Sequence, residues 1–287
     1  MSATTQIKML FIQNRLRICI TYSLVILENI GSILTPLVIG YAINRLIKQR
    51  YDGLVFLIIG WIVLVSIATF RRLYDTHTFA TIYGQLATQV VLKQRGQETS
   101  NSKVIARAAL AKELVDFFER DIPTMMGATS TLVGAVVMLS IIDGISGLSS
   151  LLLLFPLGII NYFNFKQSHA LHSKLNNEVE READVIVDST PDGVIEHFTL
   201  LAKWRVKLSN LEATNFGTME IFVLGLVVIV LSRNAVADSK PGDVYAVLAY
   251  VFNFIGGLDA VPLLVQQMGR LRDIGQRTYS EEDFESQ

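Results

Sequence analysis

The feature that most constrains this chain is a set of six long apolar stretches. A helix that crosses a bilayer needs about 20 mostly apolar residues. We place six such spans along the sequence, at residues 18–43, 53–70, 122–142, 148–165, 216–231 and 244–265. A buried core helix is the alternative for any one stretch taken alone. Six in one chain predict an all-α, polytopic membrane protein with one domain, residues 1–280, and a polar tail, residues 281–287.

Composition and charge argue against several classes of protein. Of the 287 residues, 51% are hydrophobic and 18% are charged, whereas soluble domains usually carry about 25% charged residues. The net charge of −1 gives no electrostatic basis for binding nucleic acid. The single cysteine, Cys19, has no partner for a disulfide within the chain. No nucleophile–base pair or cluster of metal ligands is recognisable, so we expect no enzyme activity, no metal and no cofactor.

The connections between the spans alternate between short and long. Short ones follow the first, third and fifth spans, and long polar ones follow the second and fourth, at residues 71–121 and 166–215. Lysine and arginine are concentrated at both termini and in the long connections, which the positive-inside rule places in the cytoplasm. Arg45, Lys48 and Arg50, beside the first short loop, weaken this assignment. We expect a protein of the bacterial inner membrane with both termini cytoplasmic.

Both long connections are predicted to be helical hairpins, because their apolar residues recur at a spacing of three and four. The stripe of the first hairpin comprises Phe79, Ile82, Leu86, Val90, Val104, Ala108, Ala111, Val115, Phe118 and Ile122. The stripe of the second hairpin comprises Leu171, Leu175, Val179, Ala183 and Ile186. Polar turns are expected at the two tips, formed by Ser100, Asn101 and Ser102 and by Pro191, Asp192 and Gly193.

Two short motifs lie near the ends of apolar segments. The first reads Leu34-Thr-Pro-Leu-Val-Ile-Gly-Tyr-Ala-Ile-Asn44, and the second reads Pro241-Gly-Asp-Val-Tyr-Ala-Val-Leu248, with Val261-Pro-Leu-Leu264 further on. In this order, with the long hairpins between them, they make nearly the whole chain resemble the six-helix membrane domain of ABC exporters. Asn44 stands where that family usually has an acid.

The resemblance implies a domain-swapped homodimer, in which the fourth and fifth helices cross to the partner copy. It also implies that the two hairpin tips correspond to coupling helices that touch an ATPase. The 287 residues contain no Gly-x-x-x-x-Gly-Lys-Ser/Thr motif for binding phosphate. We therefore expect an exporter-type membrane domain without an ATP-hydrolysing domain of its own.

Charged residues near the apolar spans are candidates for function, because charge within a bilayer is costly. The helical rise places five of them in the cytoplasmic half of the membrane: Glu28, Glu220, Asp259, Arg71 and Arg72. In one hypothesis an acid of this set takes up a proton during transport. In the other, Glu28 or Asp259 pairs with Arg71 or Arg72 and closes the helix bundle.

Other titratable residues lie along the two hairpins. Asp75 and His77 are expected on the solvated first hairpin, with a proton-relay role for His77 as the alternative. His169, His172 and His197 are spread along the second hairpin, where their spacing fits no metal site well and a site of His169 with a nearby acid stays open.

Three functions remain open from the sequence. The first is a transporter of a peptide-like or amphipathic solute driven by a proton gradient, with aromatic residues of the fourth and sixth spans lining a cavity. The second is a membrane subunit that recruits a separate ATPase, for which Val194, Ile195 and Phe198 are candidate docking residues. The third is a membrane scaffold or sensor that transports nothing.

Overall fold

The computed structural model describes residues 12–95, 101–236 and 239–269, and the elements in these ranges are helical. Six helical segments are long and apolar enough to cross a membrane, which confirms the six predicted spans. They are Arg15–Ile47, Asp52–Gln89, Ala108–Ile142, Gly144–Asp188, Pro191–Ala235 and Pro241–Gly269. The protein is therefore an all-α, multi-pass membrane protein.

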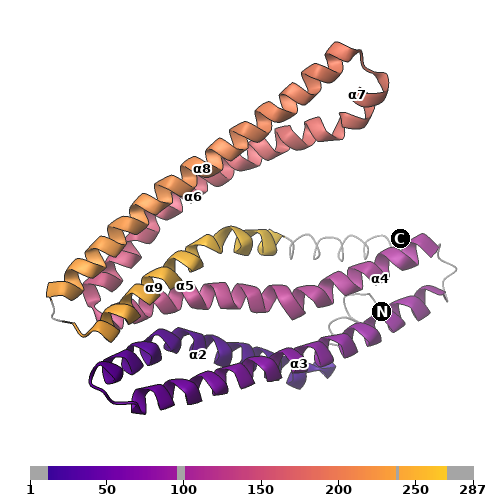
Figure 1. The fold of residues 1–287 in the computed structure, drawn as a ribbon. Helices are drawn as coiled ribbons and strands as arrows, with labels where there is room; N and C mark the ends of the chain where they lie inside the picture. Colours follow the sequence, from indigo (N-terminus) through magenta and orange to yellow (C-terminus); the bar gives the residue numbers. More distant parts are fainter. Residues whose placement is uncertain (1–11, 96–100, 237–238, 270–287) are drawn as a thin grey trace. The chain divides into compact units, whose positions relative to one another are not determined.

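The individual elements follow the sequence in a simple order (Figure 1). They are α2 (Arg15–Ile47), α3 (Asp52–Arg95), α4 (Asn101–Asp116), the π-helix η1 (Phe117–Asp121), α5 (Ile122–Ile142), α6 (Gly144–Glu180), α7 (Glu182–Asp188), α8 (Pro191–Val236) and α9 (Pro241–Asp259). α3 has 44 residues and α8 has 46. At about 1.5 Å per residue each exceeds 60 Å, about twice the thickness of the hydrocarbon core, so both helices continue well past a single span.

The chain divides into two compact units, which we describe separately. Unit 1 contains residues 1–138 and 238–287, and unit 2 contains residues 139–237.

In unit 1, α2 and α3 are joined by a tight turn with a defined hydrogen-bond pattern. The Arg50 N–H donates to the Arg45 carbonyl and the Gln49 N–H donates to the Leu46 carbonyl, at 3.0 and 2.8 Å. These are the two bonds of a Schellman motif, which ends a helix with one residue in the left-handed region. Gln49 is that residue, with φ of 54°. The turn folds α3 back along α2, as Figure 1 shows.

The first long hairpin of unit 1 packs as its apolar spacing predicts. Its core consists of Phe79, Ile82, Leu86, Ala111 and Val115, each at most 6% exposed. The helical interpretation of residues 71–95 and 101–121 is thus confirmed. The expected turn at residues 100–102 lies partly outside the described residues. Asn101 and Ser102 open α4, and Ser100 is not described.

In unit 2, α6 and α8 lie side by side and run antiparallel (Figure 1). Asp143 begins α6 as its N-cap, accepting hydrogen bonds from the Ser146 N–H at 3.0 Å and the Ser146 hydroxyl at 2.6 Å. Further along, the Asn164 amide donates to Asn215 Oδ1 at 2.7 Å. This bond sets the register of the two helices.

The tip of unit 2 differs from the prediction in two ways. The apolar stripe faces α8 only as far as Leu175. Val179, Ala183 and Ile186 are exposed, and Val185 is the buried residue instead. The reason is that α6 ends at Glu180 and the chain bends into the short helix α7, which turns the stripe away from α8.

The second difference concerns the tip turn, which was predicted at Pro191, Asp192 and Gly193. These residues form the first turn of α8, and only Ser189 and Thr190 separate it from α7. Proline is favoured at the first helical position because its missing N–H is not needed there. The Thr190 hydroxyl accepts from the Gly193 N–H at 3.3 Å and caps the helix.

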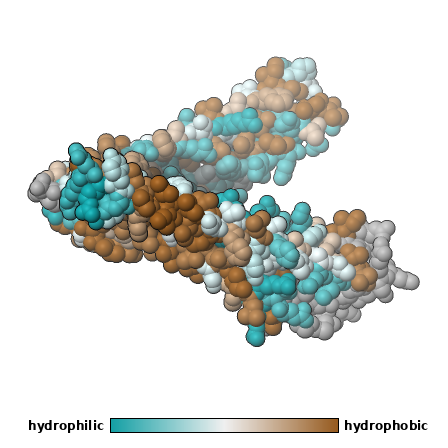
Figure 2. Space-filling model, turned by 60° about the horizontal axis from the view of Figure 1, so that its bottom comes forward, coloured by the Kyte–Doolittle hydropathy of each residue, from teal (hydrophilic) through white to brown (hydrophobic). Residues whose placement is uncertain are grey.

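The surface carries many exposed apolar side chains. Figure 2 shows hydrophobic residues in a continuous brown area, with hydrophilic residues gathered in other areas of the visible face. Val55, Phe56, Ile58, Ile59 and Trp61 of α3 are each more than half exposed. In a soluble protein such a surface would aggregate, whereas in a membrane it faces lipid or another helix.

Candidate functional site

A charged cluster lies between α2 and α3, two of the helices that are long and apolar enough to cross a membrane. Arg71 pairs with Glu28 through its Nε atom. Its Nη1 group donates to Asp75 Oδ2 at 2.8 Å. The side chains of Arg71, Glu28 and Asp75 are 16%, 23% and 6% exposed. Two carboxylates thus share one guanidinium, so the cluster has surplus negative charge whenever both acids are ionised.

The surroundings of the cluster are only partly hydrogen-bonded. Thr21 is fully buried, and neither its hydroxyl nor the Oδ1 atom of Asp75 has a hydrogen-bond partner in the described part of the chain. The hydroxyl of Tyr22 donates to the Phe118 carbonyl in η1 at 3.1 Å. π-Helical turns are frequent at functional sites. The cluster therefore contains one buried acceptor without a hydrogen bond, Asp75 Oδ1. The neighbouring residue Tyr22 connects α2 to the irregular turn η1.

The structure brings together only part of the predicted set of charged residues. Glu28 and Arg71 meet, as the pairing hypothesis expects. Arg72, Glu220 and Asp259 are exposed, and among the described residues they form no ion pair. Asp259 is the last residue of α9 and Glu220 lies in α8 of unit 2.

Asp75 was wrongly assigned to a solvated position. It is 4% exposed, because the face of α3 that carries Arg71 and Phe79 turns toward α2 and α4. The spacing of four residues from Arg71 was the available signal, since residues i and i+4 share a helix face.

A second polar group lies at the tip of unit 2. His197 Nδ1 and Glu178 Oε1 are 2.8 Å apart, and both residues are buried. Arg181 Nη1 is 3.7 Å from the other carboxylate oxygen of Glu178. This pair holds α6 and α8 together where α6 ends. Sequence spacing could not find it, because it depends on the register of two helices that meet at a distant turn.

The tip also exposes apolar side chains, which we call the tip patch: Val179, Ile186, Val187, Ile195 and Phe198. Val187 is 79% exposed and Ile195 is 66% exposed. Five acids around these side chains are also exposed, namely Glu180, Asp184, Asp188, Asp192 and Glu196.

The two sequence motifs of unit 1 meet in space. Asn44 Nδ2 donates to Asp243 Oδ1, and the Gly242 N–H donates to Asn44 Oδ1, both at 2.8 Å. Gly40 faces Gly242 so closely that a Cβ on either would overlap the other's carbonyl oxygen. The glycines and the amide thus hold the end of α2 against the start of α9.

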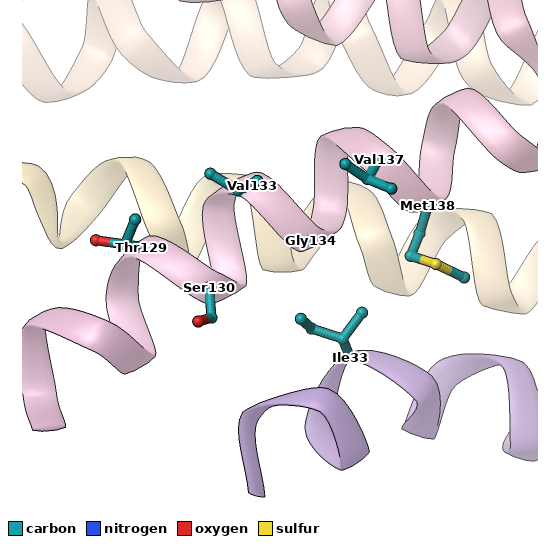
Figure 3. Close-up of a pocket in the computed structure, with 7 residues that line it drawn as sticks. All are labelled: Ile33, Thr129, Ser130, Val133, Gly134, Val137 and Met138. Carbon is teal, nitrogen blue, oxygen red and sulfur yellow. The ribbon is translucent and has the colours of Figure 1, made fainter. Parts of the chain in front are cut away.

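The small residues of α5 open a recess toward α2. This pocket of about 360 Å³ is lined by Ile33, Thr129, Ser130, Val133, Gly134, Val137 and Met138. Figure 3 shows Ser130 and Met138 pointing toward Ile33 of α2. A Cβ on Gly134 would collide with Ile33, so the glycine permits close approach of the two helices. The recess is largely apolar and suits a hydrocarbon group better than a charged one.

The described residues contain no group of three or more His, Cys, Asp or Glu side chains placed to hold a metal ion. The charged cluster offers ion pairing and, at its two carboxylates, proton exchange. The tip patch offers apolar contact with a rim of negative charge.

Comparison with known families gives a match over most of the chain. Residues 7–238 match the model of the ABC transporter transmembrane region. Comparison with individual curated proteins gave no match. The matched segment contains the elements from α2 to α8, which include five of the six candidate membrane spans and both long hairpins. By its six spans and this match, the chain belongs to the family of ABC transporter transmembrane regions.

Proposed function

We propose that this chain is the membrane domain of a transporter driven by an ATP-hydrolysing partner that docks on the tip of hairpin α6–α8. The tip patch carries this proposal. Phe198 precedes the fifth predicted span, residues 216–231, by 18 residues, or about 27 Å of helix. Lipid does not cover apolar side chains at that distance, so a protein partner is the natural cover.

The charge around the tip patch defines the surface of the partner. Asp184, Asp188 and Asp192 stand beside Ile186 and Val187 at the end of the hairpin. Complementary electrostatics favours a partner with an apolar recess rimmed by lysine or arginine. In ABC transporters the natural candidate is the ATPase, as the sequence resemblance already implied.

The docking proposal is tested by purifying the full chain from its native membranes and measuring ATP hydrolysis in the purified material. We expect activity with the wild-type chain and its loss with Ile186→Asp/Val187→Asp. Val206→Asp is the matched control, because Val206 is 57% exposed on the same hairpin but outside the tip patch. Solute transport by material that contains no ATPase would overturn the proposal.

A second candidate function is transport driven by a proton gradient, and the charged cluster favours it. A carboxylate that shares one arginine with a second carboxylate changes its proton affinity if a helix movement separates the three groups. In proteoliposomes with an imposed pH gradient, this function predicts uptake that Glu28→Gln or Asp75→Asn abolishes. Glu220→Gln and Asp259→Asn test the two other predicted acids. Uptake that requires ATP and ignores the pH gradient would exclude it.

The transported solute in our proposal is amphipathic or peptide-like. Phe155, Tyr162 and Phe252 present exposed aromatic rings, between 64% and 75% exposed. Tyr250 and Phe254 lie in the sixth predicted span and belong to the aromatic residues expected to line a cavity. They are fully buried in unit 1 and contribute to its packing. A series of fluorescent peptides of graded hydrophobicity, offered in the same proteoliposomes, tests this part of the proposal.

The assembly we propose is a homodimer in a bacterial inner membrane, with both long hairpins in the cytoplasm. Cys19 is the single cysteine of the chain, so Cys19→Ser gives a background without cysteine. In intact cells, a membrane-impermeant maleimide should label Gln49→Cys and leave Val187→Cys unlabelled. Labelling of Val187→Cys but not of Gln49→Cys would place the tip patch on the outer side of the membrane, where a cytoplasmic ATPase could not dock, and would contradict the docking proposal.

A further inference from the structure

Hairpin α6–α8 has a strongly uneven distribution of charge along its length. Two contacts between the helices bound a section of it: Asn164 with Asn215 at one end and Glu178 with His197 at the other. Residues 166–177 and 199–214 lie between these contacts, and we call this section the basic collar. It contains Lys166, Lys174, Lys203, Arg205 and Lys207, and one acid, Glu212.

The tip beyond the basic collar has the opposite charge. Residues 178–196 contain a single basic residue, Arg181, and seven acids: Glu178, Glu180, Glu182, Asp184, Asp188, Asp192 and Glu196. Most acids of the hairpin are therefore placed at its far end, and Glu212 is the one acid within the basic collar.

Three lysines of the basic collar gather around one indole ring. The ammonium groups of Lys174, Lys207 and Lys203 lie 4.9, 5.0 and 5.9 Å from the centre of the Trp204 ring. Lys174 comes from α6 and the other two come from α8, so both helices contribute. Cation–π attraction favours these positions. It does not neutralise the charges, which repel one another.

A carboxylate would normally accompany such a group of cations. Among the described residues none of these three lysines forms an ion pair, and all three are exposed. A surface with several uncompensated ammonium groups fits a ligand with phosphate oxygens. Tryptophan next to lysine is also a typical combination at the membrane–water interface.

We propose that the basic collar binds the phosphate headgroups of anionic phospholipids in the leaflet from which the hairpin emerges. Lys166 directly follows the fourth predicted span, residues 148–165, and therefore lies at the level of the headgroups. Lys174 lies eight residues further along α6, or about 12 Å of helix. The headgroup layer is about 5–8 Å thick, and the Debye length at physiological salt is about 8 Å. The electrostatic potential of an anionic leaflet therefore extends to Lys174. The acidic tip is repelled by the same leaflet, which keeps the tip patch away from the membrane surface.

Trp204 itself can report on this binding. The chain has two tryptophans, and Trp61→Phe leaves Trp204 as the single one. The experiment titrates this full-length variant in detergent with short-chain phosphatidylglycerol or phosphatidylcholine and follows Trp204 fluorescence. We expect half-saturation with phosphatidylglycerol at a concentration about tenfold lower or more, given the attraction of each lysine to an anionic surface. The preference should shrink as salt is raised.

Variants with matched charge separate the basic collar from a general effect of net charge. Lys174→Gln/Lys203→Gln/Lys207→Gln should remove the preference for phosphatidylglycerol. Lys48→Gln/Lys112→Gln/Lys240→Gln removes the same number of exposed charges elsewhere and should keep it. Replacing the three collar lysines by arginine should also keep it, which guards against a loss caused by misfolding.

Two results would overturn the proposal. One is equal affinity for the two lipids, or equal loss in the collar variant and its control. The other is displacement of phosphatidylglycerol by inorganic pyrophosphate at low concentration, which would show a site for a soluble phosphate. Neither result depends on an ATPase or on transport, so a failure here is distinct from a failure of the docking proposal.

Discussion

Asn44 of α2 and Asp243 of α9 are joined by a hydrogen bond of 2.8 Å, in which the amide Nδ2 donates to the carboxylate. The amide oxygen of Asn44 accepts from the Gly242 N–H at the same distance. An amide can donate and accept at once, whereas an ionised carboxylate only accepts. Asn44 stands where ABC exporters usually have an acid, and Asp243 supplies the acid from the opposite helix.

This pairing predicts the effect of restoring the usual acid. Asn44→Asp would place two carboxylates in contact and remove the donor to Asp243. We expect the variant to lose about 1–3 kcal/mol of stability at neutral pH. Asn44→Asp/Asp243→Asn should restore the contact at neutral pH. Thermal melting in detergent measures both, and equal melting of wild type and Asn44→Asp at pH 7 contradicts the prediction.

The glycine contact beside it makes a second prediction. Gly242→Ala would force a Cβ into the carbonyl oxygen of Gly40, which the backbone of α2 cannot avoid without moving. We expect it to lower the melting temperature by several degrees, in the range of about 1–3 kcal/mol for overpacking. Gly256→Ala is the control in the same helix, because no atom lies within 4 Å of the added Cβ. It should leave stability unchanged or raise it, since alanine favours helix.

The charged cluster predicts that replacing Arg71 costs more stability than replacing its neighbour Arg72. Arg71→Gln leaves Glu28 and Asp75 without their shared cation, and breaking a largely buried ion pair costs about 3 kcal/mol. Arg72→Gln changes the same charge at an exposed position and should cost less than about 0.5 kcal/mol. Adding Glu28→Gln and Asp75→Asn to Arg71→Gln should recover much of the loss. Thermal melting of the four proteins is the measurement, and similar losses for both arginines would refute the assignment.

Asp143 predicts a pH dependence of the stability, because it is titratable and lies in the short connection between α5 and α6, where its side chain is 22% exposed. The hydrogen bond from the Ser146 hydroxyl, with the Ser146 N–H and Arg233, lowers the pKa of Asp143 against partial desolvation. A lowered folded-state pKa means that the ionised form stabilises the fold. This stabilisation is complete above the ordinary pKa of aspartate, about 4, and is lost as the pH falls further through the lowered value.

Replacing Asp143 tests whether its ionised form stabilises the fold. Asp143→Ala removes the N-cap of α6 and should cost about 1 kcal/mol at pH 7. The difference between wild type and variant should narrow as the pH falls below about 4. Asp143→Asn keeps a capping oxygen, so its loss at pH 7 should be smaller. A stability difference that stays constant between pH 7 and pH 3 would contradict the proposed role.

The turn between α2 and α3 predicts a stabilising change. Gln49 adopts φ of 54°, a conformation that costs a residue with a Cβ about 1 kcal/mol relative to glycine. Gln49→Gly should therefore raise the melting temperature by about 2–4 °C. Gln49→Val should lower it, because a branched side chain fits this conformation worst. Identical melting of both variants would mean that the turn relaxes on substitution.

The parts of the fold that follow from local rules could be predicted from the sequence. The six spans need only length and hydrophobicity, and the core of Phe79, Ile82 and Leu86 needs only helical spacing. Both signals lie within one segment of chain. The same reasoning reached the pairing of Glu28 with Arg71 as one of two hypotheses, because charges inside a bilayer seek partners.

The parts that depend on contact between distant segments could not be predicted. Asp75 is buried because α2 and α4 cover it, and Glu178 meets His197 because the register of α6 on α8 brings them level. The short helix α7 was also missed, since the apolar spacing continues through Arg181 although the backbone bends there. In each case the deciding information is a tertiary contact.

The length and continuity of α8 have a mechanical consequence. From Pro191 to Val236 the helix runs for 46 residues, and its proline stands at the first position, where it does not weaken the rod. A stiff rod of this kind works as a lever arm. If it pivots by about 10° where it enters the membrane, Phe198, about 27 Å away, moves by about 5 Å. A small rearrangement among the spans thereby displaces the far end of α8 by about the size of a side chain. In the other direction, a displacement of the far end tilts the helix where it enters the membrane.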